Sequence, residues 1–217
     1  IRPKTTEWFT YFPEDYRWSA AIGGMLGLAV VGASDMGEID RTARKLKNKL
    51  GDDEAWFFTW QELGDELKQK ADDCRNRGHT ISASVFYLRA SCYYQWGERF
   101  RTVKDDHALN VYRKSVECFH EHAQLSMSPK IEIVEVPYEG NFLPGYFVHA
   151  ENTKKSKNPT MIFFDGLDIT KELQYARGVP ELIKRGYSCL VMAGPGTGEA
   201  IRFRGMFLRP DYEVAGS

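Results

Sequence analysis

The sequence predicts an α/β protein in which an all-helical N-terminal region, residues 1–128, precedes a region of strands and helices, residues 129–217. Two observations indicate this organisation. Apolar residues recur at helical spacing in the first region, whereas they alternate as in strands after Pro129. The second region also contains two short apolar runs separated by a helical pattern, which is the strand–helix–strand arrangement of a parallel sheet.

Polar residues mark the ends of the helices expected in the first region. Asp35 and Glu38 have the spacing of an N-cap followed by an acidic first turn, and Gly78 stands where a helix commonly ends. We therefore predict helices over residues 39–50, 54–77 and 105–125, with a further helix that begins at Thr80. Together they would form a helical lid over the second region.

One uncharged stretch, Trp18 to Ser34, raises the question of a membrane helix because it contains Gly23-x-x-x-Gly27. It is shorter than the roughly 20 apolar residues that span a bilayer. We expect a buried helix there, and no membrane partner.

The first strand-like segments predict a β-hairpin. Residues 131–136 alternate apolar and acidic side chains, but the alternation slips by one place at Ile133 and Val134. Such a slip predicts either a β-bulge or a change in which face of the strand is covered. Residues 138–141 read as a turn that leads into a second strand over 142–148.

The next two strands have nearly continuous apolar sequences. Residues 160–164 and 187–192 are both typical of strands that are covered on both faces. The helix predicted between them, residues 171–185, contains Pro180, which predicts a kink or a break. A sheet that ended at residues 187–192 would leave a row of unpaired backbone groups, so we expect a homo-oligomer, such as a homodimer.

The loop Asp165-Gly166-Leu167-Asp168 follows the first of these strands and is the best candidate for a catalytic role. Acyl-transfer chemistry needs a rigid backbone N–H aimed at the developing oxyanion, and in one α/β architecture a loop in this position supplies it. Gly166 permits the sharp turn, so the N–H of Leu167 is the candidate donor. The alternative is a turn glycine that serves only connectivity.

A second glycine-rich loop, Gly194-Pro-Gly-Thr-Gly-Glu199, follows the second apolar strand. A dinucleotide-binding fingerprint reads G-x-G-x-x-G, but here Glu199 occupies the place of the third glycine and would repel a pyrophosphate. The loop therefore predicts a tight turn before a helix, whose N-terminus Glu199 would stabilise electrostatically. A nucleotide-dependent oxidoreductase remains a minor alternative.

The sequence contains no recognisable nucleophile or metal site. A nucleophile elbow needs G-x-S-x-G between a strand and a helix, and neither Ser34 nor Ser217 lies in such a segment. His120 and His122 point to different sides of a helix and chelate poorly. The four cysteines are scattered, which is typical of reduced thiols in a cytosolic protein. We expect no metal and no cofactor.

Several segments together resemble one family of proteins. They are Val136–Gly140, Leu143–Phe147, Phe163–Asp168, Thr170–Glu172, Arg185–Leu190, Gly194–Glu199 and Arg209–Glu213, with a looser match around Gly78–Ala90. In order and spacing they resemble the esterase-like branch of α/β-hydrolases that includes 2,6-dihydropseudooxynicotine hydrolase and the fermentation-respiration switch protein. The resemblance covers the whole chain, but only the Asp165 and Gly194 loops are specific.

This resemblance implies a serine-type hydrolase, either an esterase or a carbon–carbon bond hydrolase acting on a small aromatic or ketone-containing substrate. Its fold would be the front half of an α/β-hydrolase sheet behind a helical lid. The family's serine, acid and histidine lie downstream of the segment matched by Tyr212-Glu213. Only the oxyanion position carries over, onto Leu167 with Gly166. The chain alone is thus expected to be inactive, with the remaining half supplied by the same or a separate chain. The alternative is a non-catalytic small-ligand-binding protein.

Further expectations concern the ligand and the cellular setting. Trp96, Tyr93 and Phe100 are candidates to line a substrate pocket, although aromatic side chains serve equally well as core. The formal net charge is −1 and no basic stripe is present, so we expect no nucleic-acid partner. No signal peptide is evident, which indicates a cytoplasmic protein.

Overall fold

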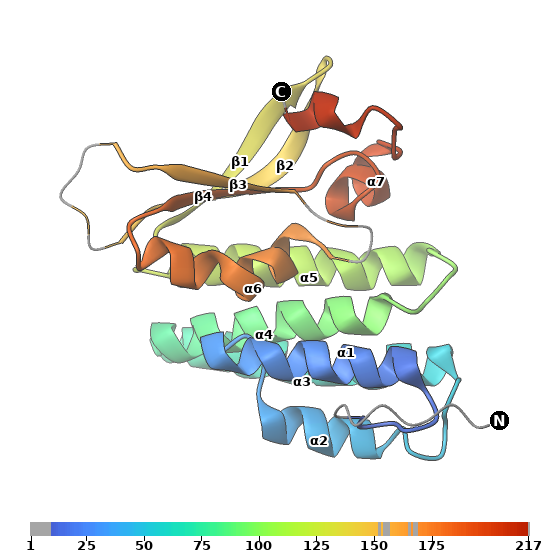
Figure 1. Ribbon diagram of the computed structural model, residues 1–217. Helices are drawn as coiled ribbons and strands as arrows, with labels where there is room; N and C mark the ends of the chain where they lie inside the picture. The colour runs from blue at the N-terminus through green and yellow to red at the C-terminus, as the bar shows by residue number, and fades with distance from the viewer. Residues whose placement is uncertain (1–9, 152, 154–156, 165, 167–168, 217) are drawn as a thin grey trace.

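The computed structural model describes residues 10–151, 153, 157–164, 166 and 169–216. Its described elements form layers in which a twisted sheet lies against a pair of helices, with further helices stacked beyond them (Figure 1). The helices are α1 (Tyr16–Gly27), α2 (Met36–Arg44), α3 (Asp53–Asn76), α4 (Thr80–Glu98), α5 (Asp106–Leu125), α6 (Lys171–Ile183) and α7 (Gly198–Arg204), with 3₁₀ turns at Leu28–Val31 and Tyr212–Gly216. The strands are β1 (Ile131–Tyr138), β2 (Asn141–Val148), β3 (Thr160–Phe164) and β4 (Ser188–Met192). The predicted α/β class with N-terminal helices is confirmed.

Helix caps explain most of the observed boundaries. The Asp35 carboxylate accepts hydrogen bonds from the backbone N–H groups of Gly37 and Glu38, at 2.9 and 3.1 Å, and so satisfies two donors at the start of α2. Gly78 follows α3 with a φ of 78°, in the left-handed conformation that glycine adopts without steric cost. The predicted end of α2 at residue 50 is wrong: after Arg44 the chain turns through i→i−3 bonds such as Leu46 N–H to Ala43 O, at 3.0 Å.

Aromatic side chains form the interior of the helical region. Trp56 contacts the rings of Trp18 and Trp60, at centroid distances of 4.9 and 5.4 Å, and its indole N–H donates to the carbonyl of Trp96 at 2.8 Å. The α1 segment buries only one face, so the buried helix expected between residues 18 and 34 is a short helix with an exposed side. In the part of the chain that the structure describes, no helix combines the length and the apolar character needed to cross a membrane.

The four described strands form one mixed sheet in the order β1-β2-β4-β3. β1 and β2 are the predicted antiparallel hairpin, joined by Glu139 and Gly140 with φ angles of 45° and 75°, as a type I′ turn requires. Their pairing is continuous from Ile131↔Val148 to Tyr138↔Asn141, so β1 has no bulge. Ile131 is buried on one face, whereas Val134 and Val136 are half-buried on the other. The slip in the sequence is thus a change of covered face.

The two parallel strands differ in a way that the sequence did not predict. β4 is buried and pairs with β2 on one side and β3 on the other. The expectation that this strand lacks a neighbour is therefore wrong. β3 is one of the two edge strands of the described sheet, with β1 at the other edge, and its Met161 and Ile162 are 44 % and 55 % exposed. The expectation that β3 is covered on both faces is also wrong for these residues, because sheet position, not composition, decides which strand is covered.

Helix α6 packs on the sheet and continues through Pro180, so of the kink or break predicted there, the break does not occur. Its buried residues, with those of α5, join the helical region to the sheet in one apolar core (Figure 1). The division of the chain at residue 128 into two domains stays a prediction.

His122 of α5 is buried in this core, where its Nδ1 lies 2.9 Å from the hydroxyl of Ser84. Burial lowers its pKa from 6.5 to about 4, so the folded protein holds the imidazole neutral. At pH values between about 4 and 6.5, His122 therefore binds a proton in the unfolded chain but not in the folded chain. We therefore expect the free energy of unfolding to fall by about 3 kcal/mol as the pH decreases from 6.5 toward 4.

Urea unfolding measured at intervals across this pH range would test the expectation. His122→Gln is expected to remove this component of the pH dependence, whereas His79→Gln, at an exposed position before α4, is expected to leave it unchanged. A wild-type profile that is as flat as that of His122→Gln would contradict it.

Candidate active site

The carboxyl ends of β3 and β4 lead into the two loops that the sequence singled out. Because the two strands are parallel and paired from Thr160↔Ser188 to Phe164↔Met192, the loops leave the same edge of the sheet. Open α/β sheets bind their ligands at such an edge. Helix α7 and the C-terminal residues lie beside it (Figure 1).

The predicted oxyanion loop is described only in part. Leu167, the candidate donor, lies outside the described residues together with Asp165 and Asp168. Gly166 is exposed, and its carbonyl accepts a hydrogen bond from the N–H of Ile169 at 3.3 Å. The roles of Leu167 and Gly166 therefore stay predictions.

The Gly194 loop is a buried, internally bonded turn. The hydroxyl of Thr197 donates to the carbonyl of Gly194 at 2.9 Å, and the N–H of Gly196 donates to the carbonyl of Met206 at 2.8 Å. Gly196 has a φ of 84°, and a Cβ there would stand 2.7 Å from the Cα of Leu208. This packing leaves no room for a pyrophosphate against Gly196, which disfavours dinucleotide binding and confirms a tight turn before a helix.

A buried ionic cluster, which we call the Lys171 cluster, joins the segments that follow β3 and β4. Its members are Thr170, Lys171 and Glu172 at the start of α6, Glu199 in the first turn of α7, and Tyr146 of β2. The ammonium group of Lys171 donates to the carboxylates of both Glu172 and Glu199. Glu172 also accepts hydrogen bonds from the hydroxyls of Tyr146 and Thr170, each at 2.7 Å.

Electrostatics keep this cluster ionised despite its burial. The side chains of Lys171 and Glu172 are 1 % and 0 % exposed. Burial alone would lower the pKa of Lys171, but the carboxylates of Glu172 and Glu199 raise it above its ordinary value. Burial would likewise raise the pKa of Glu172, but the charge of Lys171 and the hydrogen bonds that Glu172 accepts lower it. Glu199 lies in the first turn of α7, at the helix N-terminus where the sequence placed it, and it also pairs with Lys171.

A second buried ion pair connects α7 to the helical region. The Glu98 carboxylate at the end of α4 is 1 % exposed and accepts hydrogen bonds from Arg202 of α7, at 3.0 and 3.2 Å. Lys104 completes this pair at 2.7 Å, and the Arg202 guanidinium lies 4.6 Å from the ring centroid of Tyr112. Glu199 and Arg202 are three residues apart on α7. One face of this helix is therefore anchored both to the sheet region and to the N-terminal helical region.

Replacing Glu98 by glutamine is expected to lower the free energy of unfolding by about 2 kcal/mol, because it leaves Arg202 and Lys104 without their shared carboxylate. The two cations are 18 % and 34 % exposed, and hydration limits the loss. Urea unfolding would measure it. Glu135→Gln is the matched control, since Glu135 pairs with Arg204 of the same helix but is 55 % exposed. Equal losses in the two variants would contradict this role for Glu98.

Sequence reasoning missed the Lys171 cluster, although one signal was present. In α6 the residues at Glu172, Ala176, Val179 and Ile183 share a buried face, so a carboxylate stands on an otherwise apolar stripe. Glu199, the other carboxylate that Lys171 pairs with, is distant in the sequence and could not be identified from this pattern.

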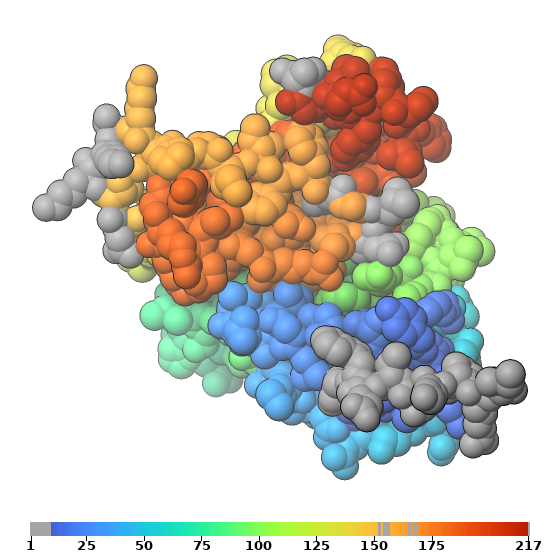
Figure 2. All heavy atoms as spheres, in the orientation of Figure 1, coloured from blue at the N-terminus to red at the C-terminus, as the bar shows by residue number. Residues whose placement is uncertain are grey.

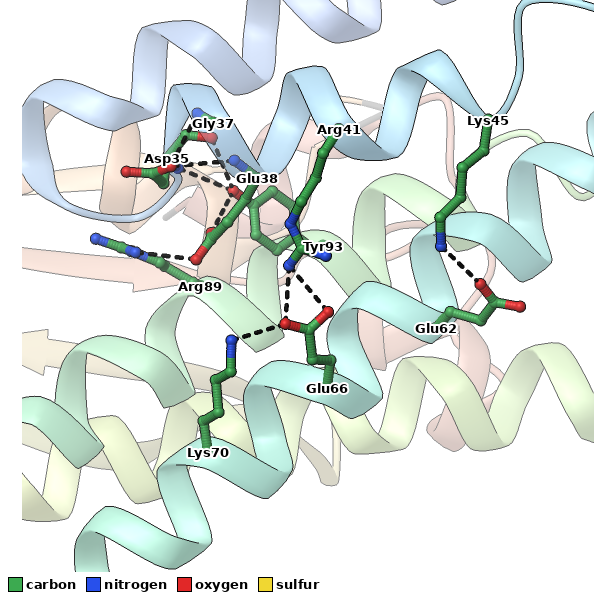
Figure 3. Close-up of polar contacts among 10 residues, drawn as sticks. All are labelled: Asp35, Gly37, Glu38, Arg41, Lys45, Glu62, Glu66, Lys70, Arg89 and Tyr93. Atoms are coloured by element: carbon green, nitrogen blue, oxygen red, sulfur yellow. Dashed lines mark hydrogen bonds and ion pairs between the residues drawn. The ribbon is translucent and has the colours of Figure 1, made fainter.

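The structure brings together two of the three predicted pocket residues. Trp96 and Phe100 line one cavity of about 520 Å³ between α1, α4 and α6. Tyr93 does not line it. Its hydroxyl accepts from the N–H of Asp35 at 2.9 Å and donates to Glu38 at 3.0 Å, inside the helical region (Figure 3).

Among the residues that the structure describes, no group of three or more His, Cys, Asp or Glu side chains is arranged to hold a metal ion. His120 lies beside the Tyr146 ring, with ring centroids 5.8 Å apart, and burial together with the charge of Lys171 lowers its pKa.

Comparison with known proteins identifies relatives over nearly the whole chain. The α/β hydrolase xenA of Xenoacremonium sinensis is 31 % identical over 212 residues, which are 95 % of this chain and 48 % of that protein. The hydrolase acrC of Aspergillus aculeatus is 30 % identical over 219 residues, 94 % of this chain and 50 % of that protein. No protein-family profile matches the sequence. The chain spans about half the length of the curated relatives it matches.

Solved structures show the same fold. The crystal structure of 2,6-dihydroxy-pseudo-oxynicotine hydrolase is similar with a TM-score of 0.69 and 24 % identity, covering 87 % of this chain and 50 % of that one. AbyA5 is similar with a TM-score of 0.57 and 21 % identity, over 86 % of this chain and 47 % of that one. At 87 % and 86 % of this chain, each similarity includes parts of both the helical region and the sheet region.

Proposed function

Because this chain carries the N-terminal portion of an α/β-hydrolase fold, we propose that it forms part of a serine-type hydrolase. The substrate is a small aromatic or ketone-containing molecule, and the bond cleaved is an ester or carbon–carbon bond. The observation that carries this proposal is the pair of loops at the carboxyl edge of β3 and β4, which the Lys171 cluster holds together beneath a helical lid.

In this proposal the backbone N–H of Leu167 stabilises the oxyanion that forms when the nucleophile attacks the substrate carbonyl. The Lys171 cluster contributes by position, since Thr170 and Lys171 follow the oxyanion loop directly and Glu199 follows the Gly194 loop. The buried cluster ties the start of α6 to the first turn of α7, the two helices that follow these loops. Such a tie supports the proposal, because a preorganised donor needs no rearrangement during the reaction.

The nucleophile, acid and histidine come from the remaining half of the hydrolase domain, in the same or a separate chain. The exposed edge of β3 is where that half would pair, since Met161 and Ile162 present apolar surface beside unpaired backbone groups. The same edge supports our proposal that the protein assembles with further polypeptide, including as a homodimer.

Labelling of the full-length protein with a fluorophosphonate probe tests the reaction class, because such probes form a covalent adduct with an activated serine. The expected result is one serine adduct on the folded protein and none after heat denaturation. Intact, folded protein that forms no adduct and hydrolyses no activated ester would overturn the proposal. That outcome would favour a non-catalytic protein that binds a small ligand in the same fold.

A further inference from the structure

The cavity of about 520 Å³ that contains Trp96 and Phe100 has an unusual combination of side chains. Its described lining consists of three arginines, three aromatic residues and two alanines: Arg17, Arg99, Arg177, Tyr16, Trp96, Phe100, Ala20 and Ala21. It is bounded by α1, α4 and α6, so it lies where the lid meets the sheet region. In Figure 2 the blue atoms of α1 lie directly below the orange atoms of α6 along this junction.

The positive charges of the cavity are arranged over flat apolar surfaces. The Arg99 guanidinium lies 5.1 Å from the ring centroid of Trp96, and the Arg17 guanidinium lies 5.3 Å from that of Phe100. Cation–π contacts of this kind hold a guanidinium in place while its N–H donors remain directed outward. Asp53 pairs with Arg17 at 3.1 Å, so the charge of Arg17 is compensated from outside the cavity lining.

Arg177 of α6 lines the same cavity as Arg17 of α1 and Arg99 at the end of α4. Partial burial and the like charge of Arg99 lower its pKa from the ordinary value. Two guanidinium groups brought together repel each other, and an anion placed between them would relieve that repulsion. Arg177 therefore supplies a cation whose electrostatic environment improves when an anionic ligand enters.

Trp96 forms a fixed part of this wall. The residue is 2 % exposed, so packing within the helical region holds its ring in place. The cavity thus combines guanidinium cations with flat aromatic surface.

We propose that this cavity binds an anionic, planar group of the ligand, a carboxylate or an enolate conjugated to an aromatic or unsaturated system, with Arg177 as its principal charge partner. A guanidinium matches the two oxygens of a carboxylate in a bidentate contact, and the aromatic walls cover a planar ring. Identification of this ligand as the substrate rests on the proposed hydrolase function. The proposal that the cavity binds such a ligand does not depend on that function.

The test measures binding to the full-length protein by isothermal titration calorimetry, with 1-naphthoate as the probe and neutral 1-naphthamide as its shape-matched counterpart. We expect 1-naphthoate to bind about 10-fold more tightly than 1-naphthamide, and the preference to shrink as the salt concentration rises. Arg177→Gln is expected to remove the preference without changing the affinity for the amide. Arg185→Gln is the control, because Arg185 follows the same helix but pairs with Glu181 and does not line the cavity.

Equal affinities for the acid and the amide, or equal effects of the two arginine variants, would overturn the proposal. Failure of either kind is distinguishable from failure of the hydrolase function, because the titration requires no turnover. A protein that forms the serine adduct but does not prefer 1-naphthoate would keep its reaction class and lose this ligand class. The reverse pair of results would establish an anion-binding cavity in a protein that is not a hydrolase.

Discussion

Replacing Lys171 by methionine in the full-length protein is expected to lower the free energy of unfolding by about 3–5 kcal/mol, because the substitution leaves the buried Glu172 and Glu199 carboxylates without their cation. Methionine retains much of the length of the lysine side chain. The loss of stability therefore reflects the missing positive charge more than a change in packing. Urea unfolding measures the stability. The rate of fluorophosphonate labelling of the fraction that remains folded shows whether the loops keep their positions.

Two further variants separate this explanation from a general effect of mutating α6. Lys184→Met removes a lysine that follows the same helix and pairs with Glu181, but it is 56 % exposed and is expected to change stability by less than about 1 kcal/mol. Lys171→Met combined with Glu172→Gln and Glu199→Gln removes the uncompensated charges and is expected to be more stable than Lys171→Met alone. A triple variant less stable than the single one would show that the cluster acts through packing rather than through charge.

Replacing Leu167 by proline in the full-length protein is expected to lower kcat for ester hydrolysis by about 100- to 1,000-fold, because proline has no backbone N–H to donate to the oxyanion. Gly166 precedes this position and accommodates the backbone restriction that proline imposes on its neighbour. The KM is expected to change little, since the missing hydrogen bond forms chiefly in the transition state. Steady-state kinetics with an activated ester would measure both constants.

Leu167→Ala is the matched control because it removes most of the same side chain and keeps the backbone N–H. It is expected to retain most of the activity. A loss in Leu167→Ala as large as that in Leu167→Pro would assign the effect to the side chain and would remove the N–H from the proposed mechanism. Unfolding curves of both variants would show whether a lost fold, rather than a lost donor, explains any change.

Local features of the fold were predictable from the sequence because neighbouring residues determine them. The carboxylate of Asp35 caps α2 through N–H groups two and three residues away. The turn at Glu139 and Gly140 likewise depends on the conformations available to two adjacent residues. The resemblance to α/β hydrolases was also carried by short segments, and comparison with known proteins confirmed it.

The candidate site was predictable only in its outline. The loops at Gly166 and Gly194 were located because each follows a strand, but the Lys171 cluster was not foreseen. In the sequence Glu172 is visible only as a charge on an apolar stripe. Glu199, the second carboxylate that Lys171 pairs with, comes from the first turn of α7, after the next strand. Trp96 and Phe100 line one cavity, whereas the hydroxyl of Tyr93 is engaged within the helical region. Their role in substrate binding stays a prediction.

By itself the sequence determined the α/β class, the helical N-terminal region, the hairpin and the loop in which the oxyanion donor is expected. Only the tertiary structure decided which strand lies at the edge, because β3 and β4 have similar apolar sequences and differ only in their partners. The tertiary structure also paired Lys171 with Glu199 and Glu98 with Arg202. The physical reason is that these contacts join residues 28 and 104 positions apart, and no local preference specifies such a distance.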